Sequence, residues 1–111
     1  MHIPFSNSRE INTPEGTIWK YFLNKEVGVS YQTLTMRSPQ AGQHLNRETN
    51  EIYFIVRGTA KFIIGDEEYD VSEKDVVVVE AKIAHHIETT DLTYLTITRP
   101  DWQIAQYEHV E

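Results

Sequence analysis

Short runs of β-branched and aromatic residues, separated by turn residues at close spacing, dominate the chain. Apolar and polar positions alternate in runs such as "TIWKYFLN", and a period of two is typical of strands. No segment carries a period of 3.6 residues over a useful length, so long amphipathic helices are not expected. The expected strands cover residues 17–24, 29–36, 51–56, 59–64, 69–71, 75–80, 85–90 and 92–98.

Many short strands at this spacing predict an all-β fold, an antiparallel β-sandwich or jelly-roll barrel. The last twelve residues, from Pro100 onward, are expected to add a turn or a short helix. The run 76–79 is apolar at every position, so we expect both faces of that strand to be covered. Trp19, Tyr21 and Leu23 share one face of another expected strand. A small barrel is not expected to cover all three of these apolar side chains. These two features predict a homodimer.

Composition limits the class of protein. The chain has 111 residues, 40% hydrophobic and 24% charged, which fits a single globular domain over residues 1–111. It has no cysteine, which excludes disulfides, thiolate metal sites and Cys nucleophiles and suits a cytoplasmic protein. No apolar stretch approaches the roughly 20 residues that span a bilayer. The first residues lack the basic and then apolar order of a signal peptide. We expect a cytoplasmic protein with no membrane partner.

The charge balance removes a further class of partner. The formal net charge is −7, and the ten Lys and Arg residues are scattered along the chain. Such a surface repels a phosphate backbone, so we expect no nucleic-acid partner. A small molecule is the expected ligand.

One segment, "AGQHLNRETNEIYFIVRG" (41–58), places ligand-type side chains against an apolar run. His44 and Asn46 are two positions apart and point to the same face of a strand. Glu51 joins them if "RETN" forms a turn. Of the later pair His85-His86, only one side chain can face the same cavity. Imidazole and carboxylate ligands suit Mn, Fe, Ni or Zn, although from spacing alone surface polar groups on loops are the more frequent explanation.

Two more side chains near this cluster have open roles. Tyr53 shares the strand face of Glu51, so it either lines the cavity as a substrate-binding residue or packs in the core. Glu48 lies in the polar turn, either as a solvated carboxylate or as an acid or base at the cavity mouth. Burying such a cluster is costly without a metal or hydrogen-bond partners.

Two segments resemble the paired motifs of the cupin superfamily. "GQHLNRETNEIYFIVRG" resembles the first motif, written HxH, three or four residues, E, six residues, G. "KDVVVVEAKIAHHIETT" resembles the second motif, a Gly-Asp, an apolar run, Pro-x-Gly and a later His. The matching positions are His44, Asn46, Glu51, Gly58, Asp75 and His85. The resemblance covers about residues 30–100 and implies a cupin barrel, with residues 1–29 packing on the barrel or on a partner.

The resemblance also implies a metal held by His44, Glu51 and His85, with position 46 as the fourth ligand. The chain departs from the motif there, because Asn46 replaces a histidine. Its amide oxygen either coordinates the metal, as a weaker donor than imidazole, or leaves that place to water. The second motif departs as well, since Lys74, Glu80 and Lys82 stand where Gly, Pro and Gly are usual.

Three functions fit these observations. The first is a metal-dependent cupin enzyme acting on a small polar, oxygen-rich molecule, with isomerase, decarboxylase or dioxygenase chemistry left unresolved. The second is a non-catalytic cupin that binds or senses a small molecule at a degenerate metal site. The third is a structural barrel whose polar cluster satisfies itself.

Overall fold

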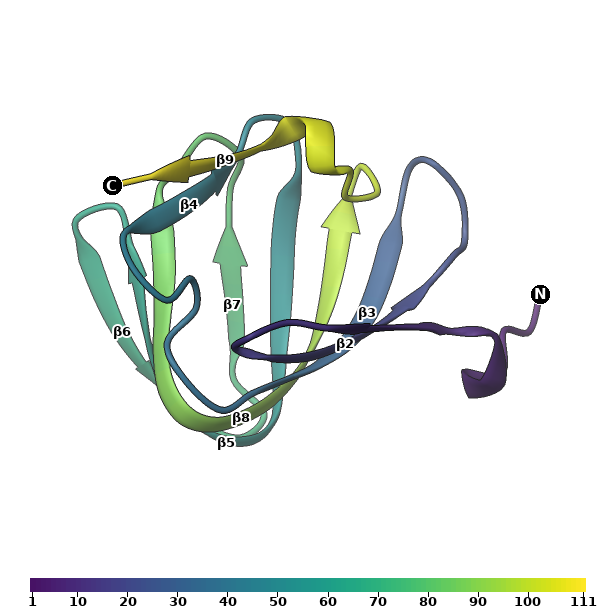
Figure 1. The fold of residues 1–111 in the computed structure, drawn as a ribbon, viewed down its shortest axis with the longest axis horizontal. Helices are drawn as coiled ribbons and strands as arrows, with labels where there is room; N and C mark the ends of the chain where they lie inside the picture. The colour runs from purple at the N-terminus through teal and green to yellow at the C-terminus, as the bar shows by residue number, and fades with distance from the viewer.

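The computed structural model describes residues 1–111, and its nine strands join in one curled antiparallel sheet (Figure 1). The strands are β1 (Arg9–Asn12), β2 (Gly16–Tyr21), β3 (Gly28–Leu34), β4 (Gln43–Asn46), β5 (Asn50–Ile64), β6 (Glu67–Val71), β7 (Val76–Val79), β8 (His85–Arg99) and β9 (Tyr107–Val110). Helix is limited to two 3₁₀ turns, η1 (Phe5–Asn7) and η2 (Ile104–Gln106). The predicted all-β class is confirmed. No helix here is long and apolar enough to cross a membrane.

The two longest strands, β5 and β8, pair along their length and form the spine of the sheet. β5 spans the expected strands 51–56 and 59–64, and β8 spans the expected strands 85–90 and 92–98. The segment around Arg57-Gly58 continues the pairing of β5 with β8 instead of turning the chain. The register shifts between Ile55 and Arg57 and again between Thr59 and Lys61, and Gly58 has a φ of 93°. Such bulges bend a strand, and β8 bends with its partner across the lower end of the barrel in Figure 1.

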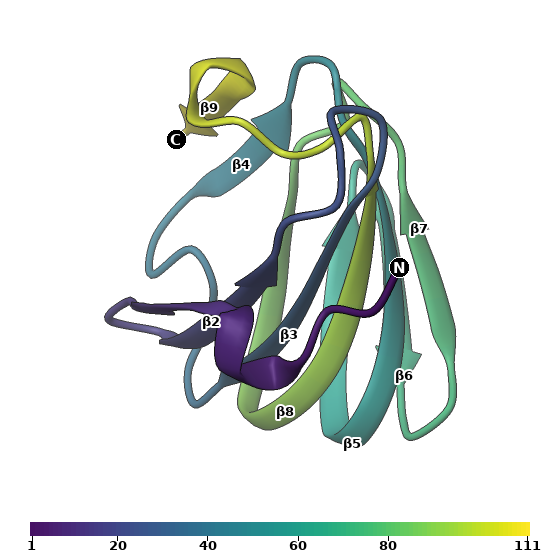
Figure 2. The same ribbon diagram turned by 90° about the vertical axis from the view of Figure 1, so that its right-hand side faces the viewer.

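The two ends of the chain supply strands that the pattern did not predict. β1 forms a hairpin with β2, and β9 pairs with β4, with Asn46 opposite Tyr107 and Gln43 opposite Val110. The turn expected after Pro100 exists as η2, but the chain then becomes extended. Figure 2 shows β4 and β9 at one end of the molecule, across from the layer that contains β5, β6 and β7.

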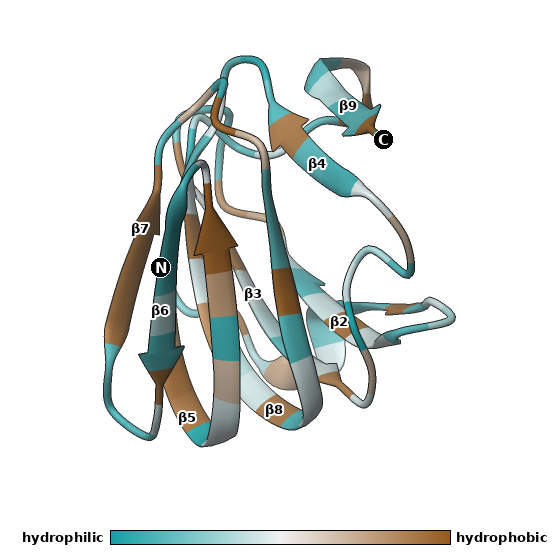
Figure 3. Ribbon diagram, turned by 90° about the vertical axis from the view of Figure 1, so that its left-hand side faces the viewer, coloured by the Kyte–Doolittle hydropathy of each residue, from teal (hydrophilic) through white to brown (hydrophobic).

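Strand β7 is an edge strand that pairs only with β5. Val77 and Val79 are buried in the core, whereas Val76 and Val78 are 58% and 55% exposed. The expectation that both faces of this strand are covered is therefore wrong for the single chain. Figure 3 shows β7 as an apolar strand on the outside of the molecule.

Polar residues take inner positions on one part of β3 and β8, whereas Leu34 and Leu92 of the same strands lie in the apolar core. Direct partners on antiparallel strands share a face, and the pairs Ser30–Thr96 and Gly28–Thr98 place the two threonines on the inner face. The outer face of the same strands carries Val29, Tyr31, Leu95 and Ile97. The inner face therefore offers hydroxyl and amide groups where a closed barrel would carry an apolar core.

Candidate functional site

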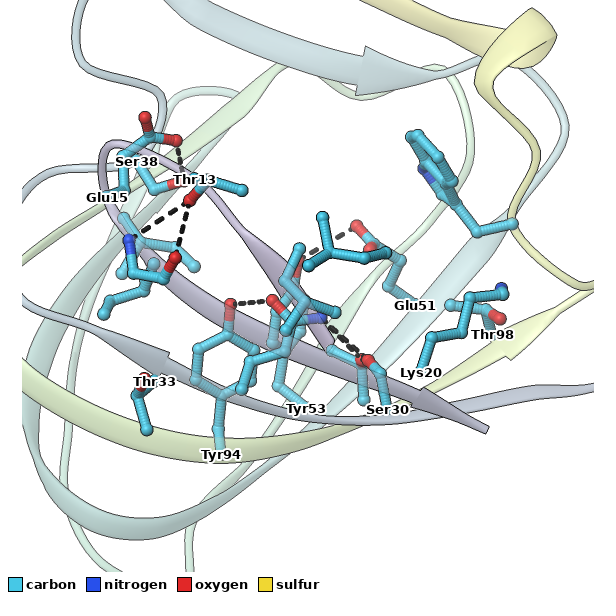
Figure 4. A pocket seen from close by; sticks show the side chains of 18 of the residues that line it. Thr13, Glu15, Lys20, Ser30, Thr33, Ser38, Glu51, Tyr53, Tyr94 and Thr98 are labelled. Atoms are coloured by element: carbon cyan, nitrogen blue, oxygen red, sulfur yellow. Dashed lines mark hydrogen bonds between the residues drawn. The ribbon is translucent and has the colours of Figure 1, made fainter. Parts of the chain in front are cut away.

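A cavity of about 270 Å³ lies between the inner face of the curled sheet and the β1–β2 hairpin (Figure 4). Glu15 and Ser38 mark one end of it, and Lys20 and Thr98 lie toward the other. His44, Asn46, Glu51 and Tyr53 all line the cavity. Four of the five residues that the sequence predicts for the site therefore border one space, and the fifth, His85, is the direct cross-strand partner of His44.

Three strands bring the ionisable residues together: His44 comes from β4, Glu51 from β5 and His85 from β8. His44 and His85 are directly opposite in register, and their ring centroids are 4.5 Å apart. The turn between β4 and β5 lets Glu51 face the same interior. That turn is anchored by Gln106, whose side-chain oxygen accepts hydrogen bonds from the Glu48 and Thr49 amides at 3.2 Å.

Glu51 is the centre of the cluster. Its Oε1 accepts hydrogen bonds from the Asn46 amide nitrogen at 2.9 Å and from the Tyr53 hydroxyl at 3.0 Å. Burial alone would raise the pKa of Glu51, but His85, together with the Tyr53 hydroxyl, holds the pKa below its ordinary value. The group is therefore a buried carboxylate at neutral pH.

His85 is almost completely buried and faces two acceptors. Its Nδ1 lies 2.9 Å from the Ile83 carbonyl oxygen, and its Nε2 lies 3.4 Å from Glu51 Oε1. The second contact is close enough for an ion pair but makes no well-directed hydrogen bond. In the tautomer in which Nδ1 donates its proton to the Ile83 carbonyl oxygen, Nε2 has a lone pair and no proton. That lone pair then points toward a lone pair of Glu51 Oε1. A cation, either a second proton or a metal ion, is needed between them.

Asn46 is oriented by hydrogen bonds at both ends of its amide. Its nitrogen donates to Glu51, and its oxygen accepts from Trp102 Nε1 at 2.9 Å and from Gln106 Nε2 at 3.0 Å. Both lone pairs of that oxygen are used. A metal bond to the Asn46 oxygen would require at least one of these hydrogen bonds to break.

The residues fit a metal ion only in part. His85 and Glu51 are spaced as two neighbouring ligands would be, but no group of three or more His, Asp or Glu side chains is arranged to hold a metal. The Asn46 oxygen is directed to Trp102 and Gln106. The four-ligand shell implied by the cupin resemblance is not assembled in this arrangement.

His44 completes the cluster at the cavity surface. Its Nδ1 lies 3.3 Å from the Tyr107 hydroxyl. Burial, followed by electrostatic repulsion from the neighbouring His85 imidazole, lowers the pKa of His44 to about 4. The imidazole is thus uncharged at neutral pH, with one nitrogen free of a protein partner.

Tyr53 combines the two roles expected for it. Its ring packs against Phe62 and Tyr94 at centroid distances of 5.1 and 5.3 Å, while its hydroxyl donates to Glu51. Burial and the neighbouring carboxylate raise the pKa of Tyr53 well above its ordinary value, so it remains a donor.

The remaining polar side chains near the motifs lie outside the cluster. Glu48 is exposed in the turn, in agreement with the solvated reading. His86 lies outside the cavity and places its Nε2 2.9 Å from Glu88 Oε2. Trp102, Gln106 and Tyr107, which the sequence analysis did not select, complete the site from the C-terminal segment.

Comparison with known proteins identifies the fold. A family profile described as a cupin domain matches residues 31–98. No curated protein sequence matches the chain. Among solved structures, the chain is similar to Pac13, a nucleoside dehydratase, with a TM-score of 0.88, 14% identity, and coverage of 100% of this chain and 91% of that one. Structures of Streptomyces Pac13 variants with uridine match similarly, one at a TM-score of 0.88 and 14% identity, over 100% of this chain and 90% of that one.

Two further solved structures match as well. Bacillus subtilis oxalate decarboxylase matches with a TM-score of 0.82 and 15% identity, over 96% of this chain and 31% of that one. A protein from Planctomyces limnophilus matches with a TM-score of 0.80 and 20% identity, over 96% of this chain and 94% of that one. At these identities the likeness shows the fold alone.

Proposed function

Since the chain belongs to the cupin family, we propose that it is an enzyme that performs acid–base chemistry on a small hydroxylated molecule in the barrel cavity. The observation that carries the proposal is the Glu51–His85 contact beside His44, where hydrogen bonds from Asn46 and Tyr53 already hold the carboxylate. Such a cluster resembles the base and carboxylate arrangements that move protons in enzymes.

His44 is the proton acceptor in this proposal. Its free ring nitrogen takes a proton from the substrate, and the nearby Glu51 carboxylate stabilises the imidazolium that results. Tyr107, at 3.3 Å from Nδ1, fixes the orientation of the ring. His85 and Asn46 hold Glu51 in place.

The structural neighbours support this choice of reaction and substrate. Pac13 is a nucleoside dehydratase with the same fold, and its variants were solved with uridine. We therefore include uridine among the candidate substrates, together with other nucleosides and neutral sugars.

Proton NMR in D₂O tests the proposal. The protein is incubated with the panel in the presence of EDTA, and loss of a substrate C–H signal or appearance of an elimination product is followed. We expect His44→Gln to slow the reaction by about 100-fold or more. The control His86→Gln should react like the wild type, because His86 lies outside the cavity. Equal rates for wild type and His44→Gln would contradict the role of His44.

A metal-dependent cupin enzyme is the second candidate, and the buried His85 Nε2 without a hydrogen-bond partner is the observation that favours it. A Mn, Fe, Ni or Zn ion would be held by His85 and Glu51, with His44 as the nearest further ligand, and would supply Lewis-acid chemistry. Activity that disappears in EDTA and returns with one of these ions would support this candidate.

A non-catalytic binding or sensor cupin is the remaining alternative. Saturable binding of a panel member with no change in its NMR spectrum would favour it over both enzymes. A cytoplasmic location stays part of the proposal, on the basis of the cysteine-free sequence.

A further inference from the structure

We infer that the cavity binds a molecule with free hydroxyl groups and no phosphate or carboxylate group, and that Thr98 and the Ser30–Thr96 pair recognise those hydroxyls. The inference rests on the proposed function, because it defines the substrate class of the same cavity. It is carried by the hydrogen bonding and the charges of side chains that the acid–base chemistry does not use.

A polar network covers the cavity floor on β3 and β8. Ser30 Oγ and Thr96 Oγ1 are hydrogen-bonded to each other, and Gln32 Nε2 donates to them at 2.8 and 3.2 Å. The Tyr94 hydroxyl donates to Gln32 Oε1 at 2.7 Å, which fixes the orientation of the amide (Figure 4).

One hydroxyl proton of this network has no acceptor within the protein. Gln32 supplies its N–H groups to the two hydroxyls, and one hydroxyl of the Ser30–Thr96 pair donates to the other. The second hydroxyl proton of the pair has no acceptor in the protein. Since both residues line the cavity, that proton is available to an oxygen of a bound molecule.

Thr98 offers a second unpaired hydroxyl on the same strand face. It is 7% exposed, it lines the cavity, and its Oγ1 has no hydrogen-bond partner. Gly28, its partner on β3, lets the backbone come close to this oxygen, because a Cβ there would lie 2.4 Å from Thr98 Oγ1 and 2.3 Å from Asp101 Oδ1. A buried unpaired hydroxyl is costly, and a ligand hydroxyl at this place would remove the cost.

The charges around the cavity disfavour an anion. Apart from His44, the ionisable acid and base side chains that line it are Glu15, Lys20 and Glu51, besides the tyrosines. Lys20 is the only cation among them, and its Nζ lies 2.8 Å from Asp101 Oδ1, with both side chains largely buried. A phosphate or carboxylate would therefore meet two carboxylates and no free cation.

Isothermal titration tests the inference. The probes are D-ribose, D-glucose, myo-inositol and adenosine, each compared with its phosphate ester, and malonate is added as a dicarboxylate. We expect at least one neutral probe to bind more tightly than its ester, and malonate not to bind. Thr98→Val should weaken the neutral probe by about 3- to 10-fold, the effect of one hydrogen bond.

Thr93→Val is the matched control. Thr93 is also buried on β8 with an unpaired hydroxyl, but it does not line the cavity, so its loss should leave the affinity unchanged. Tighter binding of the esters or malonate, no binding by any neutral probe, or equal effects of the two substitutions would overturn the inference. Binding is measured on His44→Gln as well, so that recognition is separated from the chemistry of the proposed function.

Discussion

Asn46 joins three segments of the chain through one amide group. It binds Glu51 on β5, Trp102 after β8 and Gln106 in η2, although these partners lie 5, 56 and 60 positions away in sequence. The residue that departs from the cupin motif is therefore a structural hub. An amide can be a hub here because it offers donor and acceptor groups at once, which an imidazole bound to a metal does not.

Replacing Asn46 tests its role as a hub. Asn46→Ala removes three hydrogen bonds and leaves buried groups of Glu51, Trp102 and Gln106 without partners. We expect the free energy of unfolding in urea to fall by about 2–4 kcal/mol. Asn7→Ala, at an exposed position, should change it by less than about 0.5 kcal/mol. Similar small effects for both variants would show that the amide does not hold the site together.

The lowered pKa of His44 predicts a pH dependence of stability. The folded-state pKa is about 4 and the ordinary value is 6.5, so the unfolded chain binds the proton more readily between these values. The free energy of unfolding should therefore fall as the pH drops from 6.5 to 4, by up to about 3 kcal/mol. Glu51, whose pKa is lowered, adds a further loss as the pH falls below 4.5 through its folded value.

Urea unfolding at pH 7 and pH 4 measures this dependence. His44→Gln removes the contribution of His44, so the wild type should lose more stability than the variant over this range. Parallel losses in the two proteins would mean that His44 is protonated in the folded state as readily as in the unfolded chain.

The sequence predicts part of this site and misses the rest for a physical reason. The sequence pattern singles out His44, Glu51 and His85 because ionisable side chains next to a core strand are rarely buried unless they are paired. Trp102 and Gln106 are ordinary residues in a polar tail, and only the pairing of β9 with β4 brings them to Asn46. The inward residues Thr96 and Thr98 stand at alternate positions of β8, but a sequence pattern of this kind does not state which strand face is the interior.

At the scale of elements, the alternation of apolar and polar residues predicts the strands well. A glycine that interrupts the alternation does not tell whether the chain turns or forms a bulge. Arg57-Gly58 predicts a turn, yet the structure has a bulge there, because both features use a glycine with positive φ. The turns before and after β7 have a left-handed backbone at the two positions where the cupin motif has glycine. Lys74 and Lys82, which stand at these positions, have φ values of 74° and 72°.

Gly58→Ala tests the bulge. A Cβ at this residue would lie 2.2 Å from the Asp91 carbonyl oxygen of the neighbouring strand, and φ is 93°. We expect the free energy of unfolding to fall by about 3 kcal/mol or more. The control Gly65→Ala, where the nearest atom is 3.7 Å away and φ is 59°, should cost only about 1 kcal/mol. Equal costs would mean that the strand can shift to accept the methyl group.

Lys82→Gly should stabilise the protein. Lys82 adopts a left-handed backbone, is exposed, and donates its N–H to the Asn46 carbonyl oxygen at 2.6 Å. Glycine takes this conformation without the steric cost of a side chain, so we expect a gain of about 0.5–1 kcal/mol. Thermal unfolding measures it, and a lower melting temperature would show that the lysine side chain contributes more than its backbone strain costs.

At the scale of the whole molecule, the outward-facing apolar residues of β3 and β8 belong to a larger apolar face. Their outer residues continue across the sheet into Trp19 and Tyr21 of β2 and into Phe54 and Val78 on the other side. Val78, Phe54 and Ile97 are each at least 40% exposed in the single chain. An apolar face of this extent is typical of an interface, and a second copy of the chain is the partner we expect.

Light scattering on the protein at micromolar concentration tests the homodimer. We expect twice the chain mass of 12.9 kDa, and a shift toward the monomer for Ile97→Lys. The control Ile104→Lys changes an even more exposed residue that lies in η2, outside this face, and should remain dimeric. A monomeric wild type would contradict the prediction.

Hydrogen bonds from Asn46 and Tyr53 hold Glu51 beside His85, and we propose that this cluster is assembled by these bonds and needs no metal ion as its organising centre. The most direct test is the metal content of untagged protein, purified without added metal and measured by mass spectrometry. We expect Mn, Fe, Ni and Zn far below one ion per chain in a protein that is folded and binds its ligand. One tightly bound ion per chain, whose removal by a chelator lowers the melting temperature, would contradict it.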